Sequence, residues 1–367
     1  MRTVFVGAQE KPGGVNSYTY NLAIELKRRG YESSVLSFGA CNKVHQYKGV
    51  KIRQYKTLGG TMTGIPMLYM KSLPYLIRNR KNIDVIMYQT VIFSIIPSLV
   101  VRLFGIRTCA IIHSLAEDSP KHGPFMKLIL KTAMKLALSL ANNVITVSDS
   151  KAREVYDRYK VRCKVLPCGV FLPTDRDDDN NLGLLTELGI IGGKYFLTVG
   201  RIDPIKNYEA LIDAFMQHDH SGYQLVICGD TNNPYAKTIV NRALLCKNII
   251  FPGVVTGTLK SILLKNCMAY CLVSSSEGLP IALLEGMSYG KIPIVTRIPS
   301  IQGVLENYGI GLWCEVNNVD HIKSNMVKVE CNYEQYRHYG EIAYKIVKDN
   351  YTWPMICDRY LELVKEL

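Results

Sequence analysis

The segment from Ser274 to Val295 constrains the fold more than any other part of the sequence. The apolar run that ends at Val273 indicates a buried strand, Pro280 suits the first position of a helix, and Ile292 to Thr296 indicates a second buried strand. A strand, a helix and a strand in this order predict a βαβ unit, the building block of parallel α/β sheets.

Two glutamates of this unit are candidate binding residues. Glu277 falls in the loop after the first strand, and Glu285 follows eight positions later, about a turn and a half into the helix at roughly 3.6 residues per turn. Both can face the crevice at the carboxyl ends of the strands, where open α/β sheets bind ligands. The alternative is a capped surface helix with two solvated acids, and the residues from Glu277 to Pro280 alone do not decide between the two.

Backbone groups between the two glutamates favour an anion. We expect free N–H groups at Gly278, Leu279, Ile281 and Ala282, at or near the start of the helix, where phosphate binds well. One glutamate can then accept hydrogen bonds from sugar hydroxyls and the other from nucleotide hydroxyls, with a diphosphate held between them.

The Glu-x7-Glu spacing and the residues around it resemble the retaining glycosyltransferases of the GT4 family, and the resemblance extends to four further places in the family's order. It implies an α/β protein of the GT-B fold, with two doubly wound, parallel-sheet (Rossmann-like) domains facing across a cleft. It also implies that a nucleotide-sugar donor contacts Glu277, Gly278, Leu279, Pro280, Ile281 and Glu285.

A pair of cations follows the strand that ends at Gly200. Arg201 and Lys206 stand five positions apart before a helix, and two cations at the carboxyl end of a strand can clamp both phosphates of a leaving diphosphate. An exposed salt-bridging pair is the alternative. Gly200, Arg201, Lys206 and Asn207 match the donor clamp of the GT4 family, so the resemblance makes Arg201 and Lys206 catalytic together with Glu277.

Two further segments concern the donor. Gly13 and Gly14 follow an expected strand and would let backbone N–H groups approach a diphosphate, although a plain tight turn is the alternative. In GT4 proteins a Gly-Gly pair at this place touches the donor's phosphates. The loop from Pro252 to Thr256 resembles the family's segment beside the nucleotide base, which implies a contact between Val255 and the ring.

His113 ends the buried strand that we expect from Thr108 onward. A histidine in such a place is often structural. In the GT4 pattern, however, a histidine at this position lies near the donor sugar and the acceptor. The resemblance therefore assigns His113 to hydrogen bonding with the sugar and not to nucleophilic attack.

The charge is unevenly distributed. Residues 1–170 carry 26 Lys and Arg against 9 Asp and Glu, and the remaining residues carry 18 against 22, which implies an anionic partner for the first part, either phospholipid or nucleic acid. The helix expected from Phe125 to Leu140 bears Lys127, Lys131 and Lys135 beside an apolar face, which suits an anionic membrane surface. An ordinary helix packed on the sheet, with solvated lysines, is the alternative.

A length of 367 residues predicts two domains. We expect an N-terminal acceptor-binding domain over 1–172, a linker over 173–181, a nucleotide-sugar-binding domain over 182–350 and, over 351–367, a helix that crosses back to the first domain. Cys168 replaces the usual Asn of the GT4 segment at the end of the first domain, which puts one local turn contact in doubt. Pro74 predicts a break in any helix from Met67 to Lys81.

Several features favour a cytoplasmic protein. Met1 to Gly7 indicates a strand and not a secretory leader. The apolar stretch from Val91 to His113 is interrupted by Pro97, Arg102 and Arg107, so it does not approach the ~20 clean apolar residues of a membrane span. Eleven scattered cysteines without a Cys-x-x-Cys pair indicate free thiols in a reducing compartment and argue against a metal site.

The resemblance to the GT4 family therefore implies a hexosyltransferase that uses a nucleotide-diphosphate sugar, with UDP favoured over GDP, and retains the anomeric configuration. No cofactor is expected, and a divalent metal is not expected to be required, since Asp177 to Asp179 lie in the linker. The expected acceptor is a lipid-linked saccharide or a polysaccharide or lipopolysaccharide precursor, with the enzyme peripheral on the cytoplasmic face of an anionic membrane. The alternatives are a nucleotide-sugar epimerase of the same fold and a basic nucleic-acid-binding protein, although the chain has no recognised nucleic-acid motif.

Overall fold

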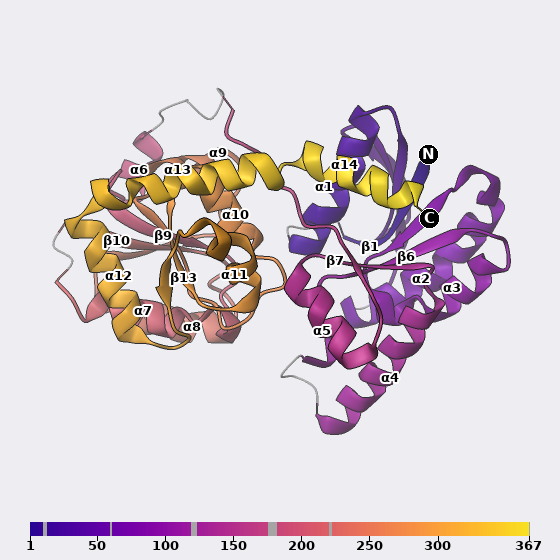
Figure 1. Ribbon diagram of the computed structural model, residues 1–367, viewed down its shortest axis with the longest axis horizontal. Coiled ribbons are helices and arrows are strands. Elements are labelled where there is room, and N and C mark those ends of the chain that lie inside the picture. Colours follow the sequence, from indigo (N-terminus) through magenta and orange to yellow (C-terminus); the bar gives the residue numbers. More distant parts are fainter. Residues whose placement is uncertain (10–12, 59–60, 119–122, 175–181, 220–221, 367) are drawn as a thin grey trace. The chain divides into compact units, whose positions relative to one another are not determined.

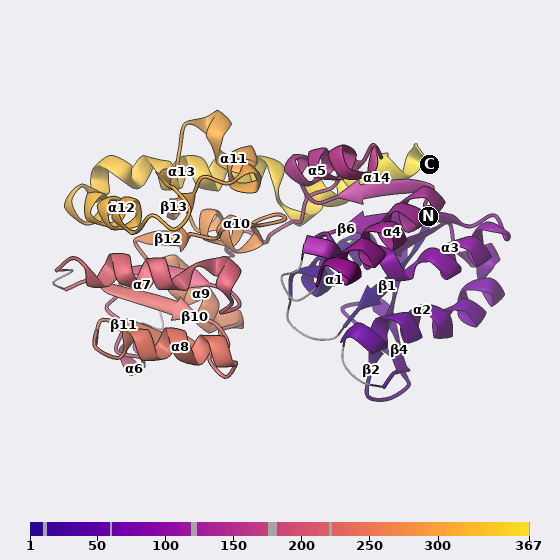
Figure 2. The same cartoon turned by 90° about the horizontal axis from the view of Figure 1, so that it is seen from below.

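The computed structural model describes residues 1–9, 13–58, 61–118, 123–174, 182–219 and 222–366. These residues form two compact units (Figure 1). Unit 1 comprises Met1–Gly169 together with Trp353–Leu367, and unit 2 comprises Val170–Thr352. In each unit, helices cover both faces of one β-sheet (Figure 2), so both units have the doubly wound α/β architecture that the sequence predicts.

The sheet of unit 1 has eight strands in the order β3-β4-β2-β1-β5-β6-β7-β8. All neighbouring strands are parallel except the edge pair of β3 and β4, which is antiparallel. The strands are β1 (Arg2–Ala8), β2 (Glu32–Gly39), β3 (Lys43–Tyr47), β4 (Val50–Lys56), β5 (Val85–Tyr88), β6 (Arg107–Ile112), β7 (Asn143–Thr146) and β8 (Lys164–Val165).

The helices of unit 1 include the last helix of the chain. They are α1 (Gly14–Arg28), α2 (Thr61–Arg78), α3 (Ile95–Arg102), α4 (Pro124–Leu140), α5 (Asp149–Tyr159) and α14 (Trp353–Lys365), with short 3₁₀ helices η1 (Arg80–Asn82), η2 (Val91–Phe93) and η3 (Ala116–Asp118). Helix α14 packs against α1. The hydroxyls of Tyr360 on α14 and Thr3 on β1 lie 2.8 Å apart, and Asp358 forms an ion pair with Arg29.

Helix α2 corrects one expectation, because it continues through both Pro66 and Pro74. A proline inside a helix removes one backbone hydrogen bond and costs about 3 kcal/mol. The buried face of α2 offsets this cost, since Leu68, Tyr69 and Leu76 are fully buried in the core between α2 and the sheet. Tertiary packing therefore keeps the helix continuous where the local sequence predicts a break.

Unit 2 has a fully parallel sheet of six strands in the order β11-β10-β9-β12-β13-β14. The strands are β9 (Tyr195–Val199), β10 (Gln224–Cys228), β11 (Ile249–Gly253), β12 (Ala269–Leu272), β13 (Ile292–Thr296) and β14 (Leu312–Cys314). The helices are α6 (Gly183–Glu187), α7 (Tyr208–Met216), α8 (Pro234–Ala243), α9 (Gly257–Asn266), α10 (Ile281–Ser288), α11 (Pro299–Leu305), α12 (Val319–Cys331) and α13 (Tyr333–Asn350), with η5 (Pro204–Lys206) and η6 (Glu306–Tyr308).

The strands of unit 2 are almost wholly buried, because apolar cores lie on both faces of the sheet. This is why they appear in the sequence as continuous apolar runs. Among the described residues, the helices include none that is both long and apolar enough to cross a bilayer.

Candidate functional site

The central feature of unit 2 is an ion pair between Lys206 and Glu277. Lys206 ends η5, which follows β9, and Glu277 lies in the loop between β12 and α10. Because β9 and β12 are neighbouring parallel strands, these loops meet at the same edge of the sheet. The Lys206 Nζ lies 2.5 Å from Glu277 Oε1, and the two side chains are only 16% and 12% exposed. The Ser274 hydroxyl donates a further hydrogen bond of 2.6 Å to the same carboxylate oxygen.

Backbone contacts fix the two loops against each other. The N–H of Ser275 donates to the carbonyl of Ile205 at 2.8 Å. The hydroxyl of Thr296, at the end of β13, donates to the carbonyl of Ser274 at 2.5 Å. The ion pair is therefore held from three strands, and a shift of either loop would break at least one of these hydrogen bonds.

Helix α10 approaches β12 closely because residue 286 is glycine. A Cβ at Gly286 would lie 2.6 Å from the ring of Tyr270. The Tyr270 hydroxyl in turn accepts a hydrogen bond from the N–H of Val199 at 3.2 Å and donates to the Val199 carbonyl at 3.1 Å. Gly286 and Tyr270 thus connect the position of α10 to the end of β9, just before the loop that carries Lys206.

The other two charged candidates of unit 2 have separate partners. Glu285 on α10 forms an ion pair of 2.6 Å with Lys260 of α9. Arg201 is 86% exposed, and its guanidinium lies 3.3 Å from the carboxylate of Asp203. The structure therefore brings together Lys206 and Glu277, while Glu285 and Arg201 pair elsewhere. Lys260 was not predicted, because it lies outside every motif and reaches Glu285 only through the packing of α9 on the sheet.

The start of α10 differs from the expectation in two details. Pro280 precedes the first helical residue, Ile281, instead of occupying the first position itself. The N–H of Ile281 donates to the Leu279 carbonyl at 2.9 Å, and Gly278 also has an interaction partner. Ile281 therefore does not offer the free N–H group that we expected from the sequence. The macrodipole of α10 still directs positive potential toward this loop.

Val255 lies in the core of unit 2. Its side chain is 6% exposed and packs with residues of α9 and α10, whereas the neighbouring Val254 is 64% exposed. The Val255 side chain therefore presents little surface to a nucleotide base, because the loop after β11 turns it inward.

In unit 1 the two glycines lie at the start of α1. Gly13 is the residue before the helix, with φ of +157°, and Gly14 is its first residue. The Gly13 carbonyl accepts a hydrogen bond of 2.8 Å from the N–H of Ser17. The Asn16 side chain accepts one of 2.8 Å from the N–H of Gln9, which joins the described end of β1 to the helix.

His113 follows β6 and is surrounded by residues from β5 and α1. Its Nε2 lies 2.9 Å from the Oε1 of Gln89, and the ring of Tyr18 packs edge-on at a centroid distance of 5.0 Å. Burial lowers the pKa of His113 to about 4, so the imidazole is neutral at physiological pH. In the neutral ring, a proton on Nε2 donates to Gln89 and leaves Nδ1 as an acceptor.

Gln89 was not predicted from the sequence. It follows β5 and is only 4% exposed, and its Nε2 has no hydrogen-bond partner among the described residues. A buried amide with an unpaired donor, directly beside His113, is a polar group that a ligand hydroxyl can satisfy. The only sequence signal was its place directly after the apolar run that forms β5.

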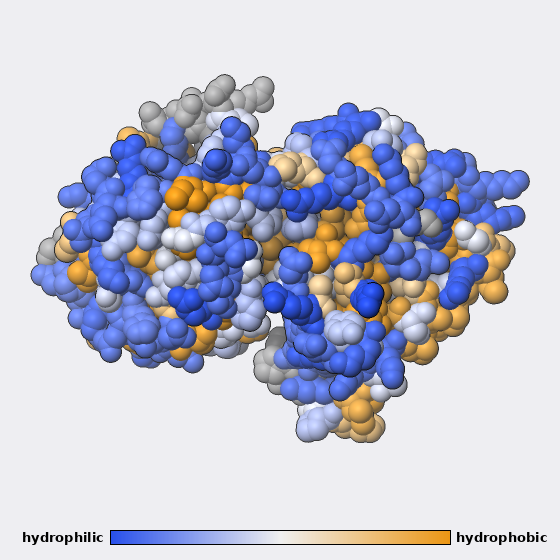
Figure 3. Space-filling model, in the orientation of Figure 1, coloured by the Kyte–Doolittle hydropathy of each residue, from blue (hydrophilic) through white to orange (hydrophobic). Residues whose placement is uncertain are grey.

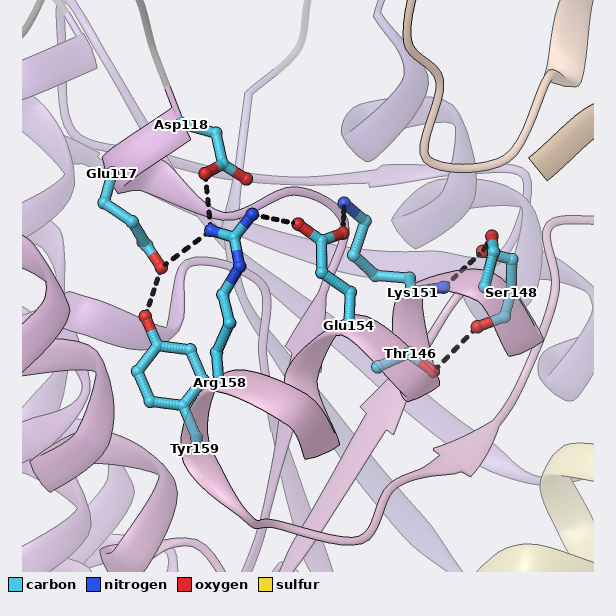
Figure 4. A network of polar contacts seen from close by, with 9 residues as sticks. Glu117, Asp118, Thr146, Ser148, Lys151, Glu154, Arg158 and Tyr159 are labelled. Carbon is cyan, nitrogen blue, oxygen red and sulfur yellow. Dashed lines mark hydrogen bonds and ion pairs between the residues drawn. The ribbon is translucent and has the colours of Figure 1, made fainter. Parts of the chain in front are cut away.

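The loop after His113 is anchored by a polar network (Figure 4). The guanidinium of Arg158 on α5 lies 2.5 Å from Asp118 and 3.7 Å from Glu117, both in η3. The Tyr159 hydroxyl donates to Glu117. The network therefore fixes the segment between His113 and η3 to helix α5.

A second part of this network lies nearer the start of α5. One carboxylate oxygen of Glu154 lies 2.6 Å from the guanidinium of Arg158, and the other lies 2.5 Å from the ammonium of Lys151. Ser148 caps the helix by accepting from the N–H of Lys151. Both cations, Arg158 and Lys151, have acidic partners, so the network accounts for two positive charges of the basic half without a ligand.

The lysine row of α4 is present and points in more than one direction. Lys131 and Lys135 are exposed, whereas Lys127 is half-buried. Steps of four residues advance by about 40° around a helix, which carries Lys127 toward the packed side.

Within the residues that the structure describes, no group of three or more His, Cys, Asp or Glu side chains is arranged to hold a metal ion. Asp177 to Asp179 lie outside these described residues.

Comparison with known proteins gives two family matches, one in each half of the chain. Residues 12–172 match the model of "Glycosyltransferase Family 4", and residues 188–346 match that of "Glycosyl transferases group 1". The first match includes Gly13, Gly14 and His113, and the second includes the Lys206–Glu277 pair and Glu285.

Individual relatives are more distant. A "Probable sucrose-phosphate synthase" of Thermosipho melanesiensis is 26% identical over 64% of this chain, and the match spans 57% of that relative's length. A solved sucrose-phosphate synthase from Thermosynechococcus elongatus has a TM-score of 0.80 at 17% identity, with 100% of this chain and 99% of that chain covered. HepE from Anabaena, solved with UDP and glucose, has a TM-score of 0.80 at 16% identity, with both chains fully covered. These likenesses establish the GT-B fold.

Proposed function

We propose that this chain, a GT-B glycosyltransferase of the family 4 type, transfers a hexose from a nucleotide-diphosphate sugar to an acceptor hydroxyl. The observation that supports this most directly is the Lys206–Glu277 ion pair at the carboxyl ends of β9 and β12. An ammonium group at this edge binds phosphate, and a carboxylate binds sugar hydroxyls. UDP is the favoured nucleotide, because the structurally similar HepE was solved with UDP-glucose.

In the proposed cycle the donor replaces the ion pair. The ammonium of Lys206 binds the diphosphate, and the sugar hydroxyls donate to the Glu277 carboxylate. Arg201, which is largely exposed, supplies the second positive charge to the phosphates. Glu285 binds the ribose hydroxyls, and the ion pair with Lys260 holds its carboxylate in place.

The chemistry proceeds on one face of the sugar, with retention at the anomeric carbon. The bond from this carbon to the diphosphate oxygen breaks, the acceptor oxygen forms the new bond, and the acceptor proton passes to the donor's phosphate oxygen. Lys206 and Arg201 stabilise the charge that develops on the leaving diphosphate, so the scheme requires no divalent cation and no further cofactor. Neutral His113 hydrogen-bonds the sugar.

The proposed acceptor is a lipid-linked saccharide or lipopolysaccharide precursor at the cytoplasmic face of an anionic membrane. The positive charge of residues 1–170 and the exposed Lys131 and Lys135 of α4 support this choice over a neutral acceptor. A second candidate is a soluble sugar phosphate, which the likeness to a probable sucrose-phosphate synthase favours. Both acceptor classes are anionic, so each is compatible with a basic unit 1.

The test is a sugar-transfer assay with UDP-glucose and, in turn, no acceptor, a hexose phosphate and a polyprenyl-linked saccharide. We expect release of UDP that depends on one of the two acceptors. Lys206→Ala and Glu277→Gln should each lower kcat/KM by about 10²-fold or more. Glu330→Gln is the matched control. Glu330 lies on α12 and pairs with His218, outside the site. Undiminished turnover in Lys206→Ala overturns the proposal, and conversion of the donor without an acceptor would favour an epimerase.

A further inference from the structure

Helix α3 exposes an apolar stripe to solvent. Ile96, Leu99 and Leu103, at helical spacing, are 54%, 47% and 85% exposed, and Phe104 in the following turn is 44% exposed. The opposite side of the helix, with Pro97, Ser98 and Val101, is the buried side. An amphipathic helix on a soluble domain normally presents polar residues outward, so the outward side of α3 requires an apolar partner.

Helix α4 continues this surface, because α3 and α4 pack against each other in unit 1. On α4 the exposed apolar residues include Phe125 (76%), Leu128 (63%), Ile129 (45%) and Leu136 (50%). Figure 3 shows apolar surface over α3 and at the N-terminal end of α4. We call these eight side chains of α3, its following turn and α4 the α3–α4 face. Large exposed apolar side chains gathered on neighbouring helices mark an interaction site.

Cations outnumber acids around the α3–α4 face. Asp118 of η3, which packs against α4, is exposed, but its carboxylate pairs with Arg158. The sequence contains no Asp or Glu from Val85 to Ala116 or from Gly123 to Ser148. Arg102, Arg107, Lys131 and Lys135 in these segments are exposed. The guanidinium of Arg80 lies over the Phe104 ring at 5.7 Å, so a further cation borders the apolar tip.

We propose that the α3–α4 face inserts into the boundary between headgroups and acyl chains of a bilayer that contains anionic lipid. Apolar side chains in the centre and the exposed cations Arg102, Arg107, Lys131 and Lys135 beside them match the two layers of such a surface. A second copy of this chain fits less well, since a two-fold contact through this face would bring two sets of exposed cations together, and the nearby Asp118 is already paired with Arg158. The inference rests on the proposed function, because it brings unit 1 to the leaflet that would hold a lipid-linked acceptor.

This mode differs from simple attraction of the α4 lysines to a charged surface. Electrostatic attachment alone disappears in high salt, whereas the burial of Leu99, Leu103 and Phe125 persists. Stable peripheral binding to a bilayer needs both the electrostatic attraction and the apolar burial.

The test is co-sedimentation of the full chain with phosphatidylcholine vesicles with and without phosphatidylglycerol. We expect binding that requires phosphatidylglycerol. The variant Leu99→Gln/Leu103→Gln should weaken vesicle partitioning about tenfold or more, and Lys131→Gln/Lys135→Gln should weaken it at low salt only. The matched control is Leu244→Gln/Leu245→Gln, which removes two leucines that are 70% and 90% exposed in unit 2 and should bind as the unchanged protein does.

The outcomes separate this inference from the proposed function. UDP release to a soluble acceptor analogue in the absence of vesicles should be the same in Leu99→Gln/Leu103→Gln as in the unchanged protein, which also shows that the variant folds. Full vesicle binding by that variant, or a dimer in solution that this variant dissociates, overturns the membrane face and leaves the glycosyltransferase proposal intact. If neither the unchanged protein nor any variant releases UDP while vesicle binding is preserved, only the proposed function is contradicted.

Discussion

Lys206 and Glu277 compensate each other's charge at the edge of the unit 2 sheet. Their side chains are only 16% and 12% exposed, so each charge has lost most of its hydration and depends on the other to compensate. If one partner is removed, the other charge stays in a poorly hydrated place. If both are removed, no charge needs compensation.

A double-mutant cycle tests this dependence. We expect Lys206→Met and Glu277→Gln each to lower the free energy of unfolding by about 1–3 kcal/mol. The double variant should lose less than the sum, because neither charge is then left unpaired. Urea denaturation of the three variants measures the three free energies, and strictly additive losses would show that the pair is not coupled.

His113 gives a pH dependence of known sign. Its pKa in the folded protein, about 4, is below the ordinary value of 6.5, so the unfolded chain takes up this proton first. The contribution of His113 to stability is therefore complete above pH 6.5 and is lost as the pH falls through 4, with a total of no more than about 3 kcal/mol. His113→Gln should make the free energy of unfolding less dependent on pH between 6.5 and 4 than it is in the unchanged protein. Identical curves from thermal denaturation would argue against a buried neutral ring.

Gln89 sets the environment of His113. Gln89→Glu places a carboxylate where the amide oxygen now lies, 2.9 Å from Nε2, and an adjacent negative charge favours the imidazolium. We expect the pKa of His113, followed by NMR, to rise by about one unit or more. Gln46→Glu, at an exposed position on the edge strand β3, is the control and should leave that pKa unchanged. An unshifted His113 in Gln89→Glu would mean that the contact is not maintained in solution.

At the level of elements, the packing of α10 on β12 decides where the loop that carries Glu277 lies. Gly286→Ala would place a Cβ 2.6 Å from the Tyr270 ring, and relief of this overlap costs about 1–3 kcal/mol. Because α10 follows the loop of Glu277, we also expect KM for the donor to rise. Gly303→Ala on α11 is the matched control, since its Cβ would meet nothing within 4 Å. This control should leave KM unchanged and be neutral or slightly stabilising; equal effects of both substitutions would exclude a specific contact.

The elements that the sequence predicts well are the buried parallel strands. Ile292–Thr296 was expected and found with the same bounds, because a strand covered on both faces appears as a continuous apolar run. The edge strand β3 was not predicted, since its residues are mostly exposed and polar. The predicted break at Pro74 is wrong, because α2 continues through it and a local rule cannot include the burial of Tyr69.

In the site, too, the sequence predicts some residues, whereas others are placed only by the packing of separate elements. Lys206 and Glu277 lie in recognisable motifs, and their placement after neighbouring strands follows from parallel α/β topology. Lys260 and Gln89 have no motif, because their roles arise only when separate elements pack together. The inward orientation of Val255 is likewise a property of the turn after β11 and cannot be seen in the residue type.

For the whole molecule, the two units do not follow the order of the chain. Unit 1 contains the first helix and the last, and α14 buries Trp353, Ile356 and Tyr360 there. Full burial of a large apolar side chain contributes about 1.5–3 kcal/mol, and a domain is stable by only about 5–15 kcal/mol. The folding of unit 1 should therefore depend on the final thirteen-residue helix.

This dependence predicts an asymmetric effect of truncation. A chain that ends at Thr352 should lose the protected amides of unit 1 in hydrogen exchange, whereas unit 2, whose core clusters contain no residue beyond Tyr351, should keep its own. UDP should still raise the unfolding temperature of unit 2, because Lys206, Glu277 and Glu285 all lie there. The milder variant Tyr360→Phe loses only the hydrogen bond to Thr3 and should cost about 1 kcal/mol. If unit 1 of the truncated chain stayed protected, α14 would be an accessory of that unit and not part of its core.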